Sequence, residues 1–288
     1  MITIFTPTYN RGYIIEKLYL SLCNQTSNEF EWLVVDDGST DNTRELIKQF
    51  ITDNKINVRY IYKENGGKHT AINLGVKNAA GELFFIVDSD DYLIPSAISL
   101  VINYYNNIIN NEHCAGIGFM RCNNKMEIIG NKFPFDTFEG SAHQLNELYN
   151  VNGDMAEVYK TDILRMFPFP NNNEKFCPEA LIWHRIADKY NMLWVNRAIY
   201  CCEYIPDGLT AKIVKVRMNA PLNSMQFYSE EVNRNLSYKL NLRSAINFWR
   251  FSFNSDLNFI SKCRMVRYIY YPLIIVGYLF YLKDKYYE

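Results

Sequence analysis

The stretch Leu83-Phe84-Phe85-Ile86-Val87-Asp88-Ser89-Asp90-Asp91 is an apolar run of strand length that ends abruptly in three carboxylates. Carboxylate oxygens are preferred ligands of Mg²⁺ and Mn²⁺, and Mg²⁺ commonly shares its carboxylates with the phosphates of a substrate. The stretch therefore predicts a buried strand whose carboxyl end binds a divalent cation and a nucleotide diphosphate. Taken alone, Asp88 or Asp90 could instead cap the following helix, which is a common position for aspartate.

Three further β-type runs precede this strand, and amphipathic helical patterns lie between them. The strands are expected at Ile2 to Thr6, Glu31 to Val35 and Val58 to Tyr62, and the helices at Tyr13 to Gln25 and Asp41 to Phe50. Strands that alternate with helices of this length predict βαβ units and a parallel sheet. Ligands of such sheets bind beyond the carboxyl ends of the strands, where the polar motifs of this chain fall.

The first strand runs into Thr6-Pro7-Thr8-Tyr9-Asn10-Arg11, and the second runs into Asp36-Asp37-Gly38-Ser39-Thr40-Asp41. Pro7 lacks an N–H group, so we expect it to stop the ladder and to leave small polar groups facing a ligand. The carboxylate of Asp37 only accepts hydrogen bonds, which suits the imino N–H of uracil. A solvated turn that caps the next helix is the alternative interpretation of Asp36 and Asp37.

Asn65 to Gly75 is a glycine turn that opens a helix, with Lys68 at its start. Helix N-termini and lysine side chains both favour phosphate, so we expect Lys68 to neutralise a diphosphate. The spacing is neither that of a P-loop nor that of a GxGxxG fingerprint. His69 is expected to be structural, because no second histidine follows at helical spacing.

The 288 residues are 48% hydrophobic, 15% aromatic and 21% charged, which is a globular composition. A net charge of -1 gives no bulk attraction to polyanions, so no nucleic-acid partner is predicted. Seven cysteines without metal-finger spacing favour reduced thiols in a cytosolic compartment. No signal-peptide pattern precedes Ile2, so we expect a protein that is not secreted.

In this order and spacing, TPTYNR, VVDDGSTDNT, ENGGKHTAINLGVKNAAGE and FFIVDSDDYL resemble the motifs of family 2 glycosyltransferases. The resemblance covers residues 1–100 and implies a GT-A fold, an α/β architecture in which helices flank a Rossmann-like mixed sheet. It implies a nucleotide-sugar donor, inversion at the anomeric carbon, and Mn²⁺ or Mg²⁺ bound through a DxD element. Asp90 resembles the principal metal ligand, Asp88 lies near ribose and metal, and Asp37 resembles the uracil-recognising residue.

The resemblance also implies a general base that opens a later helix, in a pattern of two acids, an apolar stripe and an arginine. Counting back from Arg185 places Glu179 at this position, although Pro178 replaces the first acid. The positive end of the helix dipole favours a carboxylate at this position. The alternative to a catalytic role is therefore that Glu179 only stabilises the helix. Asp154 follows a glycine and is a further candidate for binding donor or acceptor, with helix capping as its alternative.

The predicted nucleotide- and donor-binding residues are Thr6, Pro7, Tyr9, Arg11, Asp37, Lys68, Asn73, Asp88, Ser89, Asp90 and Asp154; Asp88 and Asp90 are also the predicted metal ligands, and Glu179 is the predicted catalytic residue.

We expect a catalytic domain over residues 1–220, divided into a nucleotide-binding half at 1–100 and an acceptor half at 101–220, followed by a helical C-terminal extension at 221–288. The acceptor half is expected to hold a helix from Ser96 to Asn110 and a strand from Ala115 to Arg121. Asp207 to Arg217 combines glycine with basic residues, which is typical of loops that close over a donor.

Tyr268 to Leu282 reads YIYYPLIIVGYLFYL and lies between basic residues. This apolar run is interrupted by Pro272 and is shorter than the roughly 20 residues of a membrane-spanning helix. Edge tyrosines and basic flanks favour peripheral membrane contact through residues 262–288, on the inner face of the cell membrane. A terminal helix packed on the catalytic domain or on a second subunit is the alternative.

These features predict a metal-dependent, hexosyltransferase-type inverting glycosyltransferase, cytoplasmic or peripheral on the membrane. It would move a sugar from a nucleotide-sugar donor, expected to be a UDP-sugar, to a glycan or lipid-linked glycan in cell-surface polysaccharide synthesis. A catalytically silent sugar-nucleotide-binding scaffold is the alternative, because Pro178 departs from the family pattern. A nucleotidyltransferase ranks last, since no glycine-rich basic loop follows the first strand. A homo-oligomer is compatible with the sequence.

Overall fold

The computed structural model describes residues 1–151, 154–202, 213–234 and 237–287, which form two compact units. The first unit contains residues 1–168 and 182–204, and the second contains residues 169–181 and 205–288. The expected functional division near residue 220 stays a prediction. The expected donor-covering loop lies largely outside the described residues, and only its end from Ile213 is described.

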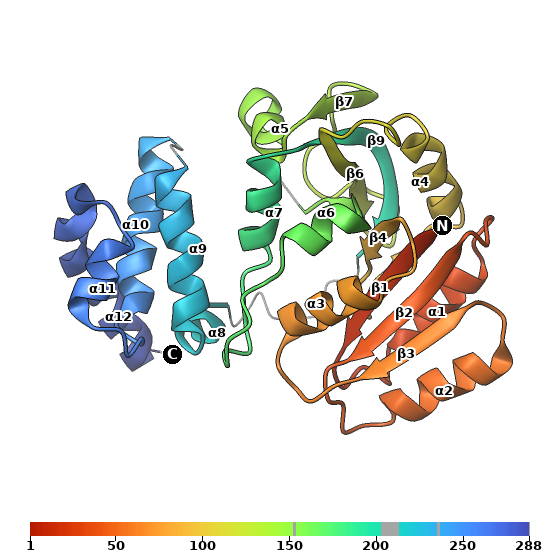
Figure 1. Ribbon diagram of the computed structural model, residues 1–288, viewed down its shortest axis with the longest axis horizontal. Coiled ribbons are helices and arrows are strands. Elements are labelled where there is room, and N and C mark those ends of the chain that lie inside the picture. Colours follow the sequence, from red (N-terminus) through yellow and green to blue (C-terminus); the bar gives the residue numbers. More distant parts are fainter. Residues whose placement is uncertain (152–153, 203–212, 235–236, 288) are drawn as a thin grey trace. The chain divides into compact units, whose positions relative to one another are not determined.

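The first unit is built on a mixed sheet with the strand order β3-β2-β1-β4-β8-β6-β9-β5, and β7 pairs with β9 (Figure 1). Strands β1 to β4 are parallel, whereas β8 inserts between β4 and β6 and is antiparallel to both. The strands are β1 (Ile2–Thr8), β2 (Phe30–Asp36), β3 (Val58–Tyr62), β4 (Leu83–Ile86), β5 (Tyr92–Leu93), β6 (Cys114–Cys122), β7 (Thr137–Gly140), β8 (Ala156–Lys160) and β9 (Asn191–Cys201).

Helices cover both faces of the parallel strands (Figure 1). Apolar side chains of α1, α2 and α4 join one core with Ile4, Trp32 and Phe85 of the sheet. Helix α3 packs on the other face so closely that a Cβ at Gly75 would lie 2.2 Å from the ring of Phe5. The helices of this region are α1 (Ile15–Cys23), α2 (Thr43–Asp53), α3 (Lys68–Asn78), α4 (Ala97–Tyr105), α5 (Ala142–Tyr149), α6 (Thr161–Met166) and α7 (Ala180–Ala187). The predicted α/β fold is therefore confirmed.

The structure corrects the expectation that Pro7 ends the ladder of the first strand. Pairing of β1 with β4 stops at Phe5, but pairing with β2 continues to Thr8, opposite Asp36. Backbone groups of a strand face its two neighbours alternately, and the carbonyl of Phe5 accepts a hydrogen bond from Val87. Pro7 therefore also faces β4, and its missing N–H group costs no hydrogen bond with β2.

The described helices of the second unit form a separate apolar core around Met225, Phe248 and Trp249. They are α8 (Ile213–Met218), α9 (Pro221–Asn233), α10 (Tyr238–Ser252), α11 (Phe259–Arg264), the 3₁₀ helix η2 (Tyr268–Leu273) and α12 (Ile274–Tyr287). Arg250 of α10 holds Asp284 of α12 through two hydrogen bonds, of 2.5 and 2.6 Å.

The expected tail helix is divided at the proline. Residues 268–273 form the 3₁₀ helix η2, which contains Pro272, and an α-helix begins only at Ile274. In an α-helix the ring of Pro272 would clash with the carbonyl four residues earlier, which disfavours α-helical geometry before it. Within the described parts of the chain, no helix is both long and apolar enough to cross a bilayer.

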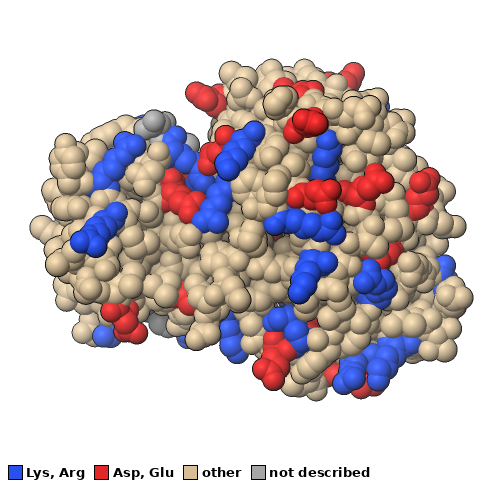
Figure 2. All heavy atoms as spheres, in the orientation of Figure 1, with Lys and Arg blue, Asp and Glu red and all other residues tan. Residues whose placement is uncertain are grey.

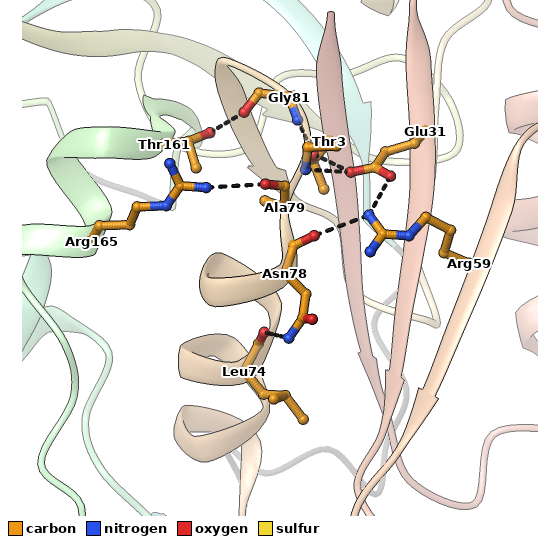
Figure 3. A network of polar contacts seen from close by, with 10 residues as sticks. Thr3, Glu31, Arg59, Leu74, Asn78, Ala79, Gly81, Thr161 and Arg165 are labelled. Carbon is orange, nitrogen blue, oxygen red and sulfur yellow. Dashed lines mark hydrogen bonds and ion pairs between the residues drawn. The ribbon is translucent and has the colours of Figure 1, made fainter.

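A buried carboxylate joins three strands at the edge of the sheet opposite the polar motifs (Figure 3). Glu31 of β2 accepts hydrogen bonds from the hydroxyl of Thr3 at 2.7 Å, from the guanidinium of Arg59 at 2.7 Å and from the backbone of Ala80 at 2.8 Å. Burial alone would raise the pKa of Glu31, but these three donors hold it below its usual value.

We expect Glu31→Gln to lower the free energy of unfolding by about 2 kcal/mol near neutral pH, because a neutral amide cannot replace the charge-assisted hydrogen bonds. The folded pKa of Glu31 is depressed, so its contribution is fully present above the unfolded value of about 4.3 and is lost as pH falls through the folded value. Urea unfolding of both proteins across this range measures the difference, with Glu29→Gln at an exposed position as the control. Equal stability at neutral pH would contradict the assignment.

Candidate active site

The acidic turn, Asp88 to Asp91, follows β4 directly at the carboxyl end of the parallel strands. Lys68, the first residue of α3, places its ammonium nitrogen 2.8 Å from a carboxylate oxygen of Asp88. Ser89 and Asp91 are buried, whereas Asp88 and Asp90 are partly exposed. The structure thus brings together Lys68 and the DxD residues that the sequence nominated.

The two partly exposed carboxylates of the turn have opposite pKa shifts. Burial would raise the pKa of Asp88, but Lys68, together with Arg121 and Arg11, lowers it below its usual value. Burial and the charge of Asp88 raise the pKa of Asp90. Two adjacent carboxylates that repel each other are stabilised by a cation between them.

Both carboxylates fit a hard divalent cation by their chemistry. Mg²⁺ usually takes one or two protein carboxylates and completes its shell with water and substrate phosphates. Among the described residues, no group of three or more histidine, cysteine, aspartate or glutamate side chains is placed to hold a metal ion. Asp88 and Asp90 could supply two ligands of a cation, with water and a bound diphosphate supplying the others.

Asp37 lies at the end of β2 and is surrounded by donors from one loop. Its carboxylate accepts hydrogen bonds from Lys63 at 2.5 Å, from the backbone of Gly66 at 2.9 Å and from the backbone of Gly67 at 2.7 Å. Gly67 has a φ of 93°, a conformation that glycine adopts at little cost. Asp37 therefore fixes the loop that leads into α3 and Lys68.

The ends of β1 and β2 are joined by side chains of their turns. The backbone of Asn10 donates to the hydroxyl of Ser39 at 2.8 Å, and the side-chain carbonyl of Asn10 accepts from the backbone of Thr40 at 2.8 Å. Arg11 donates a backbone hydrogen bond to Thr43, at the start of α2. The two predicted nucleotide-binding turns therefore form one surface beside the acidic turn.

The other nominated residues of this surface differ in exposure. Tyr9 is 49% exposed, whereas Thr6 is buried and accepts a hydrogen bond from the indole of Trp32 at 3.0 Å. The hydroxyl of Thr8 is buried and has no hydrogen-bond partner among the described residues. Pro7 lies within β1, and Asn73 lies in the middle of α3. Of these residues, Tyr9 is thus the one whose side chain is open to a ligand.

Glu179 immediately precedes α7 and belongs to the second unit, whereas the acidic turn belongs to the first. Asp154 is exposed and precedes β8. Of the basic residues in the expected donor-covering loop, Lys212 lies outside the described residues. Lys215 and Arg217 fall in α8, where Arg217 hydrogen-bonds the hydroxyl of Tyr228. The catalytic role of Glu179 and the closing role of the loop stay predictions.

Three residues near these motifs were not nominated from the sequence: Lys63, Arg121 and Tyr200. Lys63 is the first residue after β3. It could have been nominated because it lies at the carboxyl end of a predicted parallel strand, as the other motifs do. Arg121 and Tyr200 lie in β6 and β9, far along the chain, and nothing in their local sequence marks them. Burial raises the pKa of Glu157 in β8 to about 7, although Arg121 and a hydrogen bond from Tyr159 oppose the shift. A buried carboxyl that titrates near neutrality is typical of functional sites.

Charges of both signs are interspersed on the face of the molecule drawn in Figure 2. This distribution agrees with the net charge of -1. At the candidate site, the cations that act on Asp88 are Lys68, Arg121 and Arg11.

Residues 3–127 match the family model described as glycosyl transferase family 2. An uncharacterized glycosyltransferase of Rickettsia felis is 34% identical over 281 residues, which cover 92% of this chain and 41% of that protein. Chondroitin synthase of Pasteurella multocida is 38% identical over 105 residues, which cover 36% of this chain and 11% of that protein. The chain thus spans less than half the length of both relatives.

Among solved structures, residues 1–349 of S. aureus TarS in complex with UDP-GlcNAc have a TM-score of 0.64 and 21% identity, covering 98% of this chain and 80% of that one. The mannosyltransferase PcManGT from Pyrobaculum calidifontis, in complex with GDP-Man and Mn²⁺, has a TM-score of 0.58 and 15% identity, covering 99% of this chain and 87% of that one. At these identities the likeness concerns the fold. The sequence match and the shared architecture together make the chain a member of glycosyl transferase family 2 with a GT-A fold.

Proposed function

We propose that this chain is an inverting glycosyltransferase that transfers a sugar from a UDP-sugar to a glycan or lipid-linked glycan acceptor in cell-surface polysaccharide synthesis. The acidic turn carries this proposal, because it presents Asp88 and Asp90 at the carboxyl end of β4 with Lys68 in contact. A site with two carboxylates and a lysine suits a metal-bound diphosphate better than a neutral ligand. Support also comes from the family and from the UDP-GlcNAc bound to TarS.

Asp90 and Asp88 are the proposed ligands of Mn²⁺ or Mg²⁺, of which Mn²⁺ is present in the PcManGT complex. A bound cation of this kind would stabilise negative charge on the departing nucleotide diphosphate. Lys68 lies 2.8 Å from Asp88, so its ammonium would be close enough to help stabilise the negative charge on the departing diphosphate. Asp37 is the proposed uracil-recognising residue, with its carboxylate oriented by the loop that contains Gly66 and Gly67.

Inversion requires a hydroxyl to attack the anomeric carbon from the face opposite the leaving diphosphate. The attacking hydroxyl loses a proton, which a carboxylate within hydrogen-bond reach can accept. Glu179 is the proposed base, supported by its place just before α7 and by the spacing to Arg185. Asp154 is the proposed contact to donor or acceptor.

Calorimetric titration with a set of UDP-sugars and Mn²⁺ is expected to show metal-dependent binding of one donor. Asp90→Ala should abolish this binding, because it removes a proposed metal ligand. Asp162→Ala is the matched control, since the side chain of Asp162 is 90% exposed and pairs with Arg165 of the same helix. If the wild-type chain bound none of the UDP-sugars with Mn²⁺, the proposed donor class would be wrong.

Glu179→Gln is expected to reduce transfer by about 10²–10⁴-fold while leaving the affinity for the UDP-sugar unchanged, because an amide cannot accept the proton. Release of UDP from the identified donor, followed with and without glycan acceptors, measures this. Glu147→Gln, at an exposed position of α5, is the control. Donor binding without any turnover in the wild-type chain would favour a silent scaffold instead.

The second unit carries an apolar surface that supports peripheral membrane contact. Ile275 and Leu279 are spaced four residues apart on α12 and are 68% and 61% exposed. Tyr268, at the start of η2, is 78% exposed. Basic residues precede and follow this segment, as expected for a helix that lies on anionic headgroups.

Ile275→Asp combined with Leu279→Asp is expected to abolish sedimentation with phosphatidylglycerol vesicles, because charged side chains do not enter the apolar part of the interface. These substitutions are preferable to deletion of residues 264–288, which would remove Val266 and Tyr270 from the core. Leu148→Asp on α5, at a position 62% exposed, is the control. Undiminished sedimentation of the double variant would rule out this surface as the contact.

A further inference from the structure

The hydroxyl of Tyr200 bridges the two ends of the acidic turn. Tyr200 lies in β9 and is fully buried. Its hydroxyl donates a hydrogen bond to a carboxylate oxygen of Asp91 at 2.7 Å and accepts one from the backbone N–H of Asp88 at 3.0 Å. Ser89 and Asp90 lie between these two anchored residues, so one hydroxyl constrains the turn from both sides.

The ring of Tyr200 is itself fixed by neighbouring strands. The guanidinium carbon of Arg121 in β6 lies 4.4 Å from the ring centroid, and the Nε of Arg121 donates to the carbonyl of Met155 at 2.9 Å. The ring of Phe85 in β4 contacts Tyr200 with centroids 6.1 Å apart. Residues of β4, β6 and β9 together therefore determine the position of this hydroxyl.

A phenol hydroxyl can donate one hydrogen bond and accept another, so one group serves the carboxylate of Asp91 and the backbone N–H of Asp88 at once. Asp91 is only 7% exposed, so loss of the Tyr200 hydroxyl removes a donor from a buried carboxylate. A buried acceptor that loses a hydrogen bond is destabilised, so the turn would be held less firmly.

We propose that Tyr200, held by Arg121, is a positioning residue that orients Asp88 and Asp90 for a divalent cation and the donor diphosphate. The inference rests on the proposed function, because it concerns the same cation and donor. Hydrogen bonds that orient metal-ligating carboxylates typically change metal affinity by 10–100-fold when they are removed. Tyr200 would thus set the affinity of the site for metal without contacting the metal or the sugar.

Tyr200→Phe tests this, because it removes only the hydroxyl and keeps the ring that Arg121 and Phe85 contact. The quantity to measure is the ratio of the UDP dissociation constant in EDTA to that in Mn²⁺, obtained by calorimetry. We expect this ratio to fall by about tenfold or more in Tyr200→Phe. Mn²⁺ binding in the presence of UDP, followed by electron paramagnetic resonance, should weaken in parallel.

Tyr60→Phe is the matched control. It removes a tyrosine hydroxyl of β3 that donates to Asp36, at the end of β2, over the same distance of 2.7 Å. Its ratio should equal that of the wild-type chain, even if uracil binding itself changes. Asp91→Asn weakens the same hydrogen bond by changing its acceptor, and we expect it to lower the ratio as well. It provides the test if Tyr200→Phe does not fold.

The outcomes separate this inference from the function on which it rests. A wild-type chain that binds UDP more tightly with Mn²⁺, combined with an unchanged ratio in a folded Tyr200→Phe or Asp91→Asn, overturns the positioning inference alone. A wild-type chain that shows no Mn²⁺-dependent UDP binding overturns the proposed function and the inference with it. A lowered ratio in both variants and an unchanged ratio in Tyr60→Phe support the inference.

Discussion

Parallel pairing of β1 with both β2 and β4 is the constraint on which the candidate site depends. The registers that place Thr8 opposite Asp36 and Phe5 opposite Ile86 bring the turns after three strands to one edge of the sheet. A slip of one residue in either register would direct every following side chain to the other face. Asp88 would then lose Lys68, so the register of the sheet and the electrostatics of the site cannot be separated.

The carboxylates at this edge are compensated to different degrees. Asp37 receives two backbone N–H groups and the ammonium of Lys63, which offset its charge within the chain. The acidic turn contains two neighbouring carboxylates, and the pKa of Asp90 is raised by burial and by Asp88. A buried negative charge without enough donors or cations around it is costly. Under the proposed function, the bound cation and the donor diphosphate complete the surroundings of Asp88 and Asp90. The acidic turn is therefore the part of the site that is stabilised by binding.

Much of the first hundred residues could be predicted because their signals are local. Apolar runs gave the four strands, and glycine or aspartate turns marked their ends. Pro7 was misjudged because a sequence does not tell which neighbour a backbone group faces. The contact of Lys68 with Asp88 was not foreseen, and its role toward a diphosphate stays a prediction. Tyr200 and Arg121 could not be nominated at all, since their significance arises only when β9 and β6 join the sheet.

The bond between Tyr200 and Asp91 joins residues separated by 109 positions. Pairings between distant segments form late, because the chain between them must be closed into a loop first. At synthesis rates of roughly 5–20 residues per second, Asp91 leaves the ribosome about 5–20 seconds before Tyr200. The motif-bearing half of the chain can therefore assemble its parallel strands during translation, while the turn that bears the carboxylates acquires its final geometry only when the last strand of the sheet has been made.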